Sequence, residues 1–126
     1  MIERYTRPRM KAIWELKHKY EIWLEVELQA CAAFEKAGQA PRGTSAKIRK
    51  KARINVERIA EIEKITKHDI IAFLESLMDT VGPEHRFLHM GLTSSDIVDT
   101  SLAVQMTEAL DLILEGLDGL LDVLKR

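Results

Sequence analysis

Hydrophobic residues in the first third of the chain recur at steps of three and four, which is the period of one face of an α-helix. The pattern starts at Ile13 and stops before Gly38, and glycine commonly ends a helix. The positions that carry it are Leu16, Tyr20, Trp23, Ala30, Phe34 and Ala37. We therefore expect one long helix from residue 13 to residue 38.

The stretch GQAPRGTS, residues 38–45, has two glycines, a proline and two small hydroxyl residues, a composition typical of a loop. Helical spacing resumes in AKIRKKAR and in INVERIAEIEKI. Asn55 is a candidate cap between these two short helices.

A further helix is expected over TKHDIIAFLESLMDTVG. Thr66 and Asp69 have the spacing of a capping box, in which side chains bind free backbone amides at a helix start. The segment PEHRFLHMGL, residues 83–92, has no hydrophobic period and is expected to be an ordered connection. His85 and His89 lie in this connection.

Thr93 and Asp96 repeat the capping spacing, and no proline follows them. One helix from there to the end of the chain would extend roughly 50 Å. Its apolar residues form a heptad seam of Met106, Leu110, Ile113, Leu117, Leu120 and Leu124. Because LLDVLKR offers no stop signal, we expect the native helix to continue beyond Arg126.

Composition favours a single soluble, all-α domain. The chain has 126 residues, of which 46% are hydrophobic and 31% charged, and no strand pattern is evident. A net charge of -1 argues against nucleic acid or an anionic membrane as partner. A lone cysteine, Cys31, among apolar neighbours and the absence of a signal peptide or membrane-length apolar run predict a cytoplasmic protein.

Several familiar chemistries are not indicated. The sequence has no glycine-rich phosphate loop, nucleophile elbow or cysteine cluster. His85 and His89 have the spacing of a helical metal pair, but their segment is a poor helix, so we expect no metal. The basic run from Lys47 to Arg53 is followed by acidic residues and lacks interleaved aromatics, which favours a solvated helix face over nucleic-acid binding.

Three polar clusters are candidates for binding: Arg4-Tyr5, Lys67-His68-Asp69 and Thr93-Ser94-Ser95-Asp96. Two of them fall at expected helix N-termini, where free amides and the helix dipole attract anions. The alternatives remain that the residues are simple caps, that His68 has only a local hydrogen bond, and that the first residues are an N-terminal arm.

The segments MIERYTRP, TKHDIIAF and GLTSSDIVDTSLA, in this order and at these separations, closely resemble the N-terminal portion of the adenylosuccinate lyase family, in the fumarase/aspartase superfamily. The resemblance covers essentially the whole chain. It implies an N-terminal helical domain over residues 1–92 and the beginning of a long central-bundle helix over 93–126, truncated in this chain. It implies no cofactor.

The family eliminates fumarate from adenylosuccinate, which gives AMP, and from succinylaminoimidazole carboxamide ribotide (SAICAR) in purine biosynthesis. By resemblance, Arg4 and Tyr5 hold the phosphate of the nucleotide substrate. The second cluster, Lys67, His68 and Asp69, lines the substrate site, with His68 as an accessory polar group.

By the same resemblance, Thr93 and Ser94 bind a succinyl carboxylate, and His89 and Ser95 are further candidates at the site. Elimination also needs an acid and a base. In the family these are a histidine and a signature-loop serine from later motifs, neither of which occurs in these 126 residues. We therefore expect no activity from this chain alone. The family assembles as a homotetramer, and three subunits form each site.

Two positions depart from the family pattern. Lys67 stands in place of the usual arginine, which keeps the charge but loses bidentate geometry, and Arg9 stands where an acidic residue is usual. The alternatives are another lyase of the superfamily, such as argininosuccinate lyase, and a helical interaction module without catalysis. Downstream catalytic motifs would distinguish these alternatives.

Overall fold

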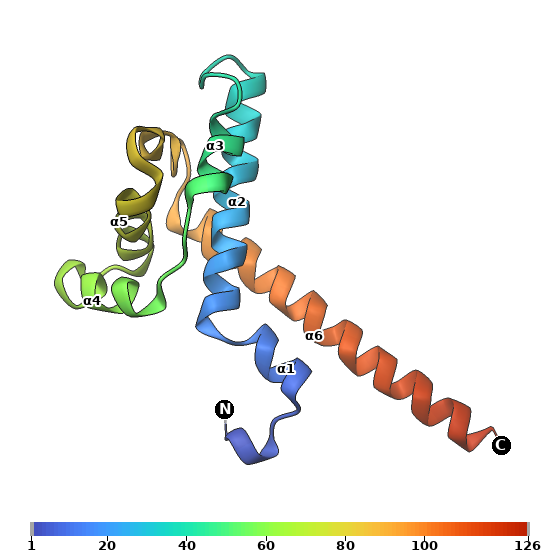
Figure 1. Cartoon of the computed structure of the whole chain (residues 1–126). Helices are drawn as coiled ribbons and strands as arrows, with labels where there is room; N and C mark the ends of the chain where they lie inside the picture. The colour runs from blue at the N-terminus through green and yellow to red at the C-terminus, as the bar shows by residue number, and fades with distance from the viewer. Residues whose placement is uncertain (1, 126) are drawn as a thin grey trace.

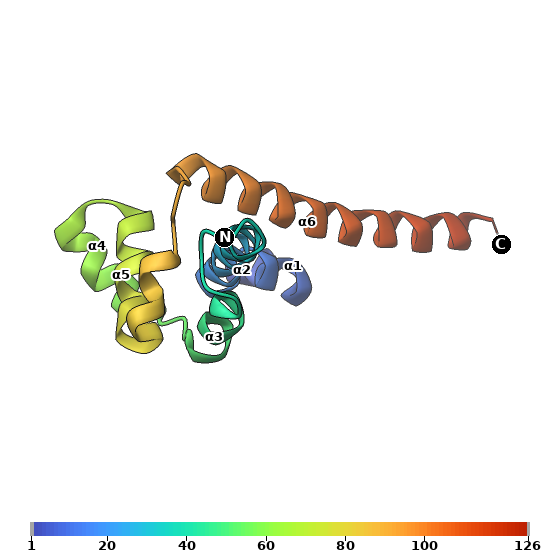
Figure 2. The same ribbon diagram turned by 90° about the horizontal axis from the view of Figure 1, so that it is seen from above.

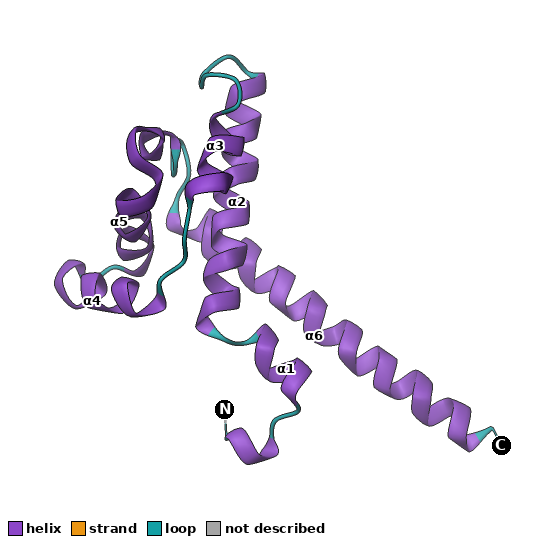
Figure 3. Cartoon of the chain, in the orientation of Figure 1, coloured by secondary structure: helices purple, strands orange, loops and turns teal. Residues whose placement is uncertain are grey.

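The computed structural model describes residues 2–125, and these residues form helices and loops without any strand (Figures 1 and 3). The all-α prediction is confirmed. The elements in chain order are the 3₁₀ helix η1 (Glu3–Tyr5), α1 (Pro8–Ile13), α2 (Leu16–Lys36), α3 (Thr44–Lys51), α4 (Val56–Thr66), α5 (Asp69–Val81), the 3₁₀ helix η2 (Gly82–Phe87) and α6 (Ser94–Leu124).

The helix expected from Ile13 to Gly38 is two helices, so that prediction is wrong at its start. Ile13 ends α1, and Glu15 has extended backbone angles (φ -73°, ψ 145°) before α2 begins. The carbonyl of Ile13 accepts a hydrogen bond of 2.6 Å from the side-chain amide of Gln105 in α6. A partner 92 positions away satisfies the end of α1, and local periodicity cannot reveal such a partner.

The cap predicted at Asn55 is confirmed, because its side chain accepts a hydrogen bond of 2.9 Å from the backbone N–H of Arg58. The cap predicted at Thr66 is wrong. Thr66 is the last residue of α4, and Lys67 then adopts a left-handed conformation (φ 53°) that reverses the chain. The N-cap of α5 is consequently His68, two residues later.

The connection between α5 and α6 is ordered, as predicted, but it begins with the 3₁₀ helix η2. Proline occupies the second position of η2, where its fixed φ suits a helix start. Its missing N–H costs nothing there, because the first N–H groups of a helix have no partner within the helix. A turn follows in which both His89 (φ 55°) and Gly91 (φ 69°) have left-handed backbone angles. This turn delivers the chain to the start of α6.

The core is built mainly from residues of α5 and α2, with further residues from α3, α4 and the first turn of α6. The Trp23 ring meets the Tyr20 and Phe73 rings edge-on at centroid distances of 5.2 and 5.5 Å, and Tyr20 stacks on Phe73 at 5.9 Å. Burial of aromatic rings contributes a large share of the hydrophobic stabilisation of a small domain. Cys31 is also buried.

Only the first half of α6 is packed, and its far end extends away from the other helices (Figures 1 and 2). Its buried residues are Ile97, Ser101, Gln105 and Ala109, and no described residue of α6 beyond them is buried. The predicted heptad seam lies on a different face and is exposed. Within residues 2–125, no helix is long and apolar enough to cross a membrane. The predicted domain boundary at residues 92 and 93 stays a prediction.

Candidate functional site

The N-terminus of α6 is closed by Thr93 and Asp96, as predicted. The Asp96 Oδ2 atom accepts from the Thr93 backbone N–H at 2.7 Å and from the Thr93 hydroxyl at 2.9 Å. These bonds, the backbone bond foremost, hold the pKa of Asp96 below its ordinary value of 3.8. The hydroxyl of Thr93 is therefore already engaged by a neighbouring carboxylate.

Ser94 and Ser95 occupy the first turn of the same helix. Neither hydroxyl has a hydrogen-bond partner among the described residues, and Ser94 is half-buried while Ser95 is exposed. The first turn of a helix also has free backbone amides and the positive end of the dipole. Ser94 is thus better prepared than Thr93 to donate a hydrogen bond to an anion.

Lys67 sits at the reversal between α4 and α5. Its side chain is exposed and lines a shallow groove of about 420 Å³ together with Glu63 and Lys64. A left-handed backbone is unfavourable for a residue with a side chain, and helices usually place glycine at this point. The lysine therefore occupies a position where the fold alone would favour glycine.

His68 and Asp69 begin α5. The His68 Nδ1 atom accepts a long hydrogen bond of 3.5 Å from the Ile71 backbone N–H and lies 3.6 Å from Asp69 Oδ1. Because Nδ1 accepts, a neutral His68 ring carries its proton on Nε2, which is available to donate. Asp69 Oδ1 accepts from the Ile70 N–H at 2.7 Å. Both side chains remain partly exposed.

One buried residue fixes the starts of α5 and α6 relative to each other. Trp23 Nε1 donates to Ser101 Oγ at 2.8 Å, two turns into α6, while Phe73 of α5 packs edge-on against the same indole at 5.5 Å. Phe73 lies one turn beyond Asp69, the first residue of α5. The second and third predicted clusters are therefore both positioned from Trp23.

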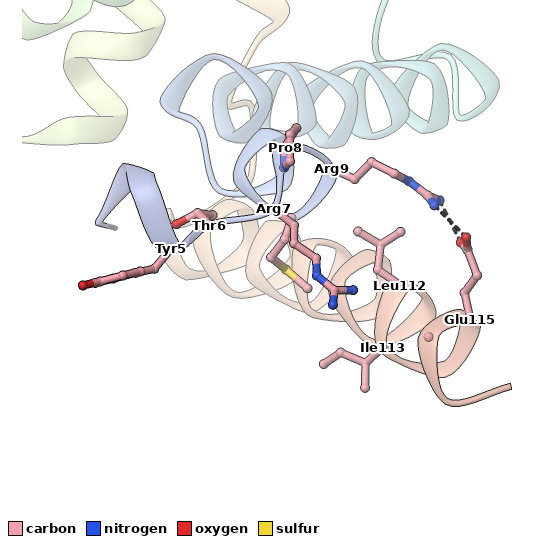
Figure 4. A pocket seen from close by; sticks show the side chains of 10 residues that line it. Tyr5, Thr6, Arg7, Pro8, Arg9, Leu112, Ile113 and Glu115 are labelled. Atoms are coloured by element: carbon pink, nitrogen blue, oxygen red, sulfur yellow. Dashed lines mark hydrogen bonds and ion pairs between the residues drawn. The ribbon is translucent and has the colours of Figure 1, made fainter. Parts of the chain in front are cut away.

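Arg4 and Tyr5 lie elsewhere, in η1. The Arg4 guanidinium stands 4.8 Å from the centre of the Tyr5 ring, and Tyr5 is 72% exposed. A groove of about 750 Å³ separates the N-terminal segment from the distal part of α6 (Figure 4). Its walls are residues 5–10 and Leu112, Ile113, Glu115 and Gly116. The ring of Tyr5 points away from Ile113.

An ion pair between Arg9 and Glu115 connects the N-terminal segment to α6. Arg9 Nη1 and Nη2 donate to the two carboxylate oxygens of Glu115 at 2.7 and 2.8 Å, a bidentate arrangement (Figure 4). This contact raises the pKa of Arg9 and lowers that of Glu115 through the shared hydrogen bonds. Both side chains are well exposed, so the pair contributes little to stability.

The three predicted clusters do not converge within one chain. Tyr5 lines the same groove as Ile113, which is nineteen residues after Ser94 on a single helix. At a rise of 1.5 Å per residue, Ile113 lies about 28 Å from Ser94. The N-terminal segment that carries Arg4 and Tyr5 also lies away from α4, α5 and the start of α6 (Figure 1). The helices that carry the other two clusters both contact Trp23.

A contact between a buried carboxylate and an imidazole, which the sequence analysis did not predict, lies at the turn before the third cluster. Glu27 Oε2 accepts from the His89 backbone N–H at 2.6 Å, and Glu27 Oε1 is 2.7 Å from His89 Nδ1. Glu27 follows Trp23 by four residues, on the apolar stripe of α2. The sequence did contain a signal for this contact, because an acidic residue on an apolar helix face that becomes buried needs a polar partner.

The two loop histidines contact different groups. His85 Nε2 is 2.7 Å from the Leu74 carbonyl oxygen, whereas His89 contacts Glu27. Among residues 2–125, no group of three or more potential ligand side chains is arranged to hold a metal ion.

The basic run is partly neutralised by the chain itself. Arg49 Nη1 lies 2.7 Å from Glu25 Oε2, which lowers the pKa of Glu25, and Lys51 Nζ lies 2.9 Å from Glu84 Oε2. These pairs agree with the interpretation of residues 47–53 as a solvated helix face.

Comparison with known proteins gives consistent matches. The family described as lyase matches residues 3–126. Adenylosuccinate lyase from Aquifex aeolicus (strain VF5) is 46% identical over 129 aligned positions, which cover 100% of this chain and 30% of that protein. Adenylosuccinate lyase from Bacillus subtilis (strain 168) is 42% identical over 125 positions, 99% of this chain and 29% of that protein.

A solved structure is also similar. The crystal structure of a fumarate lyase from Mesorhizobium sp. BNC1 superposes with a TM-score of 0.74 and 25% sequence identity, over 82% of this chain and 25% of that chain. The chain thus spans about 30% of the length of the curated relatives it matches.

Proposed function

The chain belongs to the lyase family, and from that premise we propose that it acts as the N-terminal portion of an adenylosuccinate lyase. Such an enzyme eliminates fumarate from adenylosuccinate, giving AMP, and from SAICAR in purine biosynthesis. The portion described here supplies substrate-binding side chains and is inactive alone. The relatives, 42 and 46% identical and both named adenylosuccinate lyase, favour this enzyme over another lyase of the superfamily.

The observation that carries the proposal is the separation of the predicted clusters. In one copy, Trp23 contacts both helices that begin with Lys67-His68-Asp69 and Thr93-Ser94, while Tyr5 lines the same groove as Ile113, which is about 28 Å along α6 from Ser94. A substrate that needs both a phosphate site and a succinyl site therefore requires more than one copy. The exposed distal half of α6 provides the surface through which copies would assemble, in the proposal as a tetramer in the cytoplasm.

Each cluster has a role that its chemistry supports. Ser94, with a free hydroxyl at a helix N-terminus, binds a succinyl carboxylate, and Thr93 shapes that helix start. His68 presents Nε2–H to the substrate, and Lys67 and Asp69 complete the same wall. Arg4 and Tyr5 bind the phosphate of a substrate held mainly by other copies.

The test is a chimera in which this chain replaces the corresponding portion of the Bacillus subtilis relative. Fumarate release from adenylosuccinate is measured, with argininosuccinate as the alternative substrate and analytical ultracentrifugation as the check on assembly. An assembled chimera that releases fumarate from adenylosuccinate supports the proposal. Activity on argininosuccinate alone would assign the chain to a different lyase, and an assembled but inert chimera would favour a non-catalytic module.

The matched pair of variants is Ser94→Ala and Ser45→Ala, each of which removes one hydroxyl. Since the Ser94 hydroxyl has no partner among the described residues, its loss leaves the cap of α6 intact. We expect a loss in kcat/KM of roughly 10-fold or more for Ser94→Ala, the scale of one hydrogen bond to a charged group. Ser45→Ala should leave kcat/KM unchanged.

A further inference from the structure

Among the described residues, Glu27 is the one acidic residue that is buried, and its side chain has no exposed surface. Both carboxylate oxygens contact the same residue, the backbone N–H of His89 at 2.6 Å and its Nδ1 atom at 2.7 Å. A buried carboxylate with its polar partner is commonly no more stable than a hydrophobic pair of similar volume. Folding alone therefore gives little reason for a glutamate at this position.

The contact fixes the protonation of one nitrogen of the imidazole. An ionised carboxylate can only accept hydrogen bonds, so the His89 Nδ1 atom carries a proton. The ring's other nitrogen, Nε2, has no hydrogen-bond partner among the described residues, and 24% of the side chain remains exposed. Glu27 thus holds one edge of the ring inside the protein and leaves the other polar atom available.

The backbone of His89 supports the same interpretation. Its φ of 55° lies in the left-handed region, which glycine adopts without a Cβ penalty. The chain does use glycine in that region two residues later, at Gly91 (φ 69°). A histidine at 89 therefore keeps an unfavourable backbone conformation, which indicates that its side chain is needed there.

The ring lies near the predicted carboxylate site. Asp96 has a pKa lowered chiefly by its bonds to Thr93, and His89 makes a further favourable electrostatic contribution. His89 is also only four residues before Thr93, in the turn that leads into α6. His89 and Ser94 therefore lie within one short segment of the chain, at the turn into α6.

We propose that Glu27 is a positioning residue that holds His89 as the Nδ1–H tautomer and so presents Nε2 to the substrate bound beside Ser94. The role toward substrate rests on the proposed function. The fixed tautomer does not, because the contact lies entirely within this chain.

The tautomer is tested by ¹⁵N NMR of the histidine rings in this chain, at a pH at which His89 is neutral. We expect the His89 Nδ1 to be protonated and Nε2 to be unprotonated, with Glu25→Gln as a matched control that leaves this signal unchanged. Glu27→Gln should shift the ring toward the Nε2–H form. A predominantly Nε2–H His89 in the unaltered chain would overturn the proposal, and this result needs no variant to fold.

The role toward substrate is tested by a double-mutant cycle in the active chimera. Glu27→Gln and His89→Gln should each lower kcat/KM, by roughly 10- to 100-fold, the range seen when a group that orients a metal-binding histidine is lost. The double variant should be no worse than His89→Gln, because Glu27 acts through that ring. A purely structural Glu27 would instead give losses that multiply, since its bond to the backbone N–H of residue 89 survives the His89 substitution.

The two proposals fail in different ways. An inactive chimera with the unaltered chain contradicts the proposed function. The ¹⁵N NMR spectrum of the His89 ring is then the one remaining test of whether Glu27 fixes the tautomer. An active chimera in which Glu27→Gln behaves like Glu25→Gln contradicts the positioning role and leaves the proposed function intact.

Discussion

The indole N–H of Trp23 donates to the hydroxyl of Ser101 at 2.8 Å and so joins α2 to α6 across 78 residues of sequence. The same hydroxyl donates to the Val98 carbonyl at 2.9 Å, so it is used as both acceptor and donor. Trp23 and Ser101 are both buried. This bond sets the position of the helix whose first turn contains Ser94.

Replacing Ser101 by alanine should therefore destabilise the chain. The substitution leaves a buried indole N–H without an acceptor, which costs about 1–3 kcal/mol in the free energy of unfolding. Urea titration followed by tryptophan fluorescence measures the change. Thr107→Ala, which removes an exposed hydroxyl bound only to the Ala103 carbonyl of its own helix, is the control and should stay within about 0.5 kcal/mol of the unaltered chain. Equal losses in the two variants would contradict the role of the bond.

Acid should weaken the loop between α2 and α3 through Glu35. Its carboxylate accepts from the backbone N–H groups of Ser45 at 2.5 Å and Gly43 at 2.7 Å, and these bonds, those from Ser45 foremost, hold its pKa below 4.5. A lowered folded-state pKa gives stability that is present above the ordinary value and is lost as pH falls through the lowered one. The stability difference between the unaltered chain and Glu35→Gln should be full above about pH 5.

Urea unfolding at a series of pH values tests this expectation. The difference between the two chains should shrink steadily below pH 4.5, the ordinary value for Glu35, and disappear in strong acid. A difference that stayed constant across the series would mean that the carboxylate charge is unimportant and that only the shape of the side chain supports the loop.

Local signals in the sequence were sufficient for most of the helices, although not for the break between α1 and α2, and for two of the three predicted caps. Asn55 and the pair Thr93 and Asp96 were found because a cap binds backbone groups only a few residues away. The cap at Thr66 was predicted wrongly because Thr66 and Asp69 have the same spacing as a true capping pair. The start of α5 is instead set by the left-handed backbone of Lys67, and a lysine gives no sequence signal for that conformation.

The contacts that build the candidate site were beyond the reach of local patterns. Glu27 contacts His89 across 62 residues, and nothing in a single sequence indicates that these two residues are partners. The separation of Tyr5 from Ser94 required the length and straightness of α6. Binding clusters could thus be proposed from residue types and family resemblance, but their mutual arrangement needed the fold.

The exposed seam of α6 should make the chain self-associate. Its side chains are about half exposed or more, from 49% for Leu117 to 72% for Leu124, over a helix that other parts of the chain leave uncovered. Continuous apolar surface of this kind favours association. Analytical ultracentrifugation over a concentration series should show oligomers for the unaltered chain.

A neighbouring pair of substitutions tests whether the seam is responsible. Leu117→Lys places a charge on the apolar face and should shift the chain toward monomer, whereas Asp118→Lys changes the net charge more but lies on the polar side. Equal dissociation in both variants would attribute the association to net charge. A monomeric unaltered chain at all concentrations would contradict the role assigned to α6.

Lys67 should show a conflict between stability and binding. Its left-handed backbone is unfavourable for lysine and easy for glycine, so Lys67→Gly should raise the free energy of unfolding by up to about 1 kcal/mol. Lys64→Gly, in the last turn of α4, is the control and should lower it by up to about 1 kcal/mol. In the active chimera, Lys67→Gly should raise KM roughly 10-fold or more because a charged donor is lost from the substrate site. Lys67→Arg, which keeps the charge and gains a bidentate group, should retain most of the affinity. A more stable Lys67→Gly variant with an unchanged KM would mean that the lysine contributes nothing to binding, and it would remove Lys67 from the proposed site.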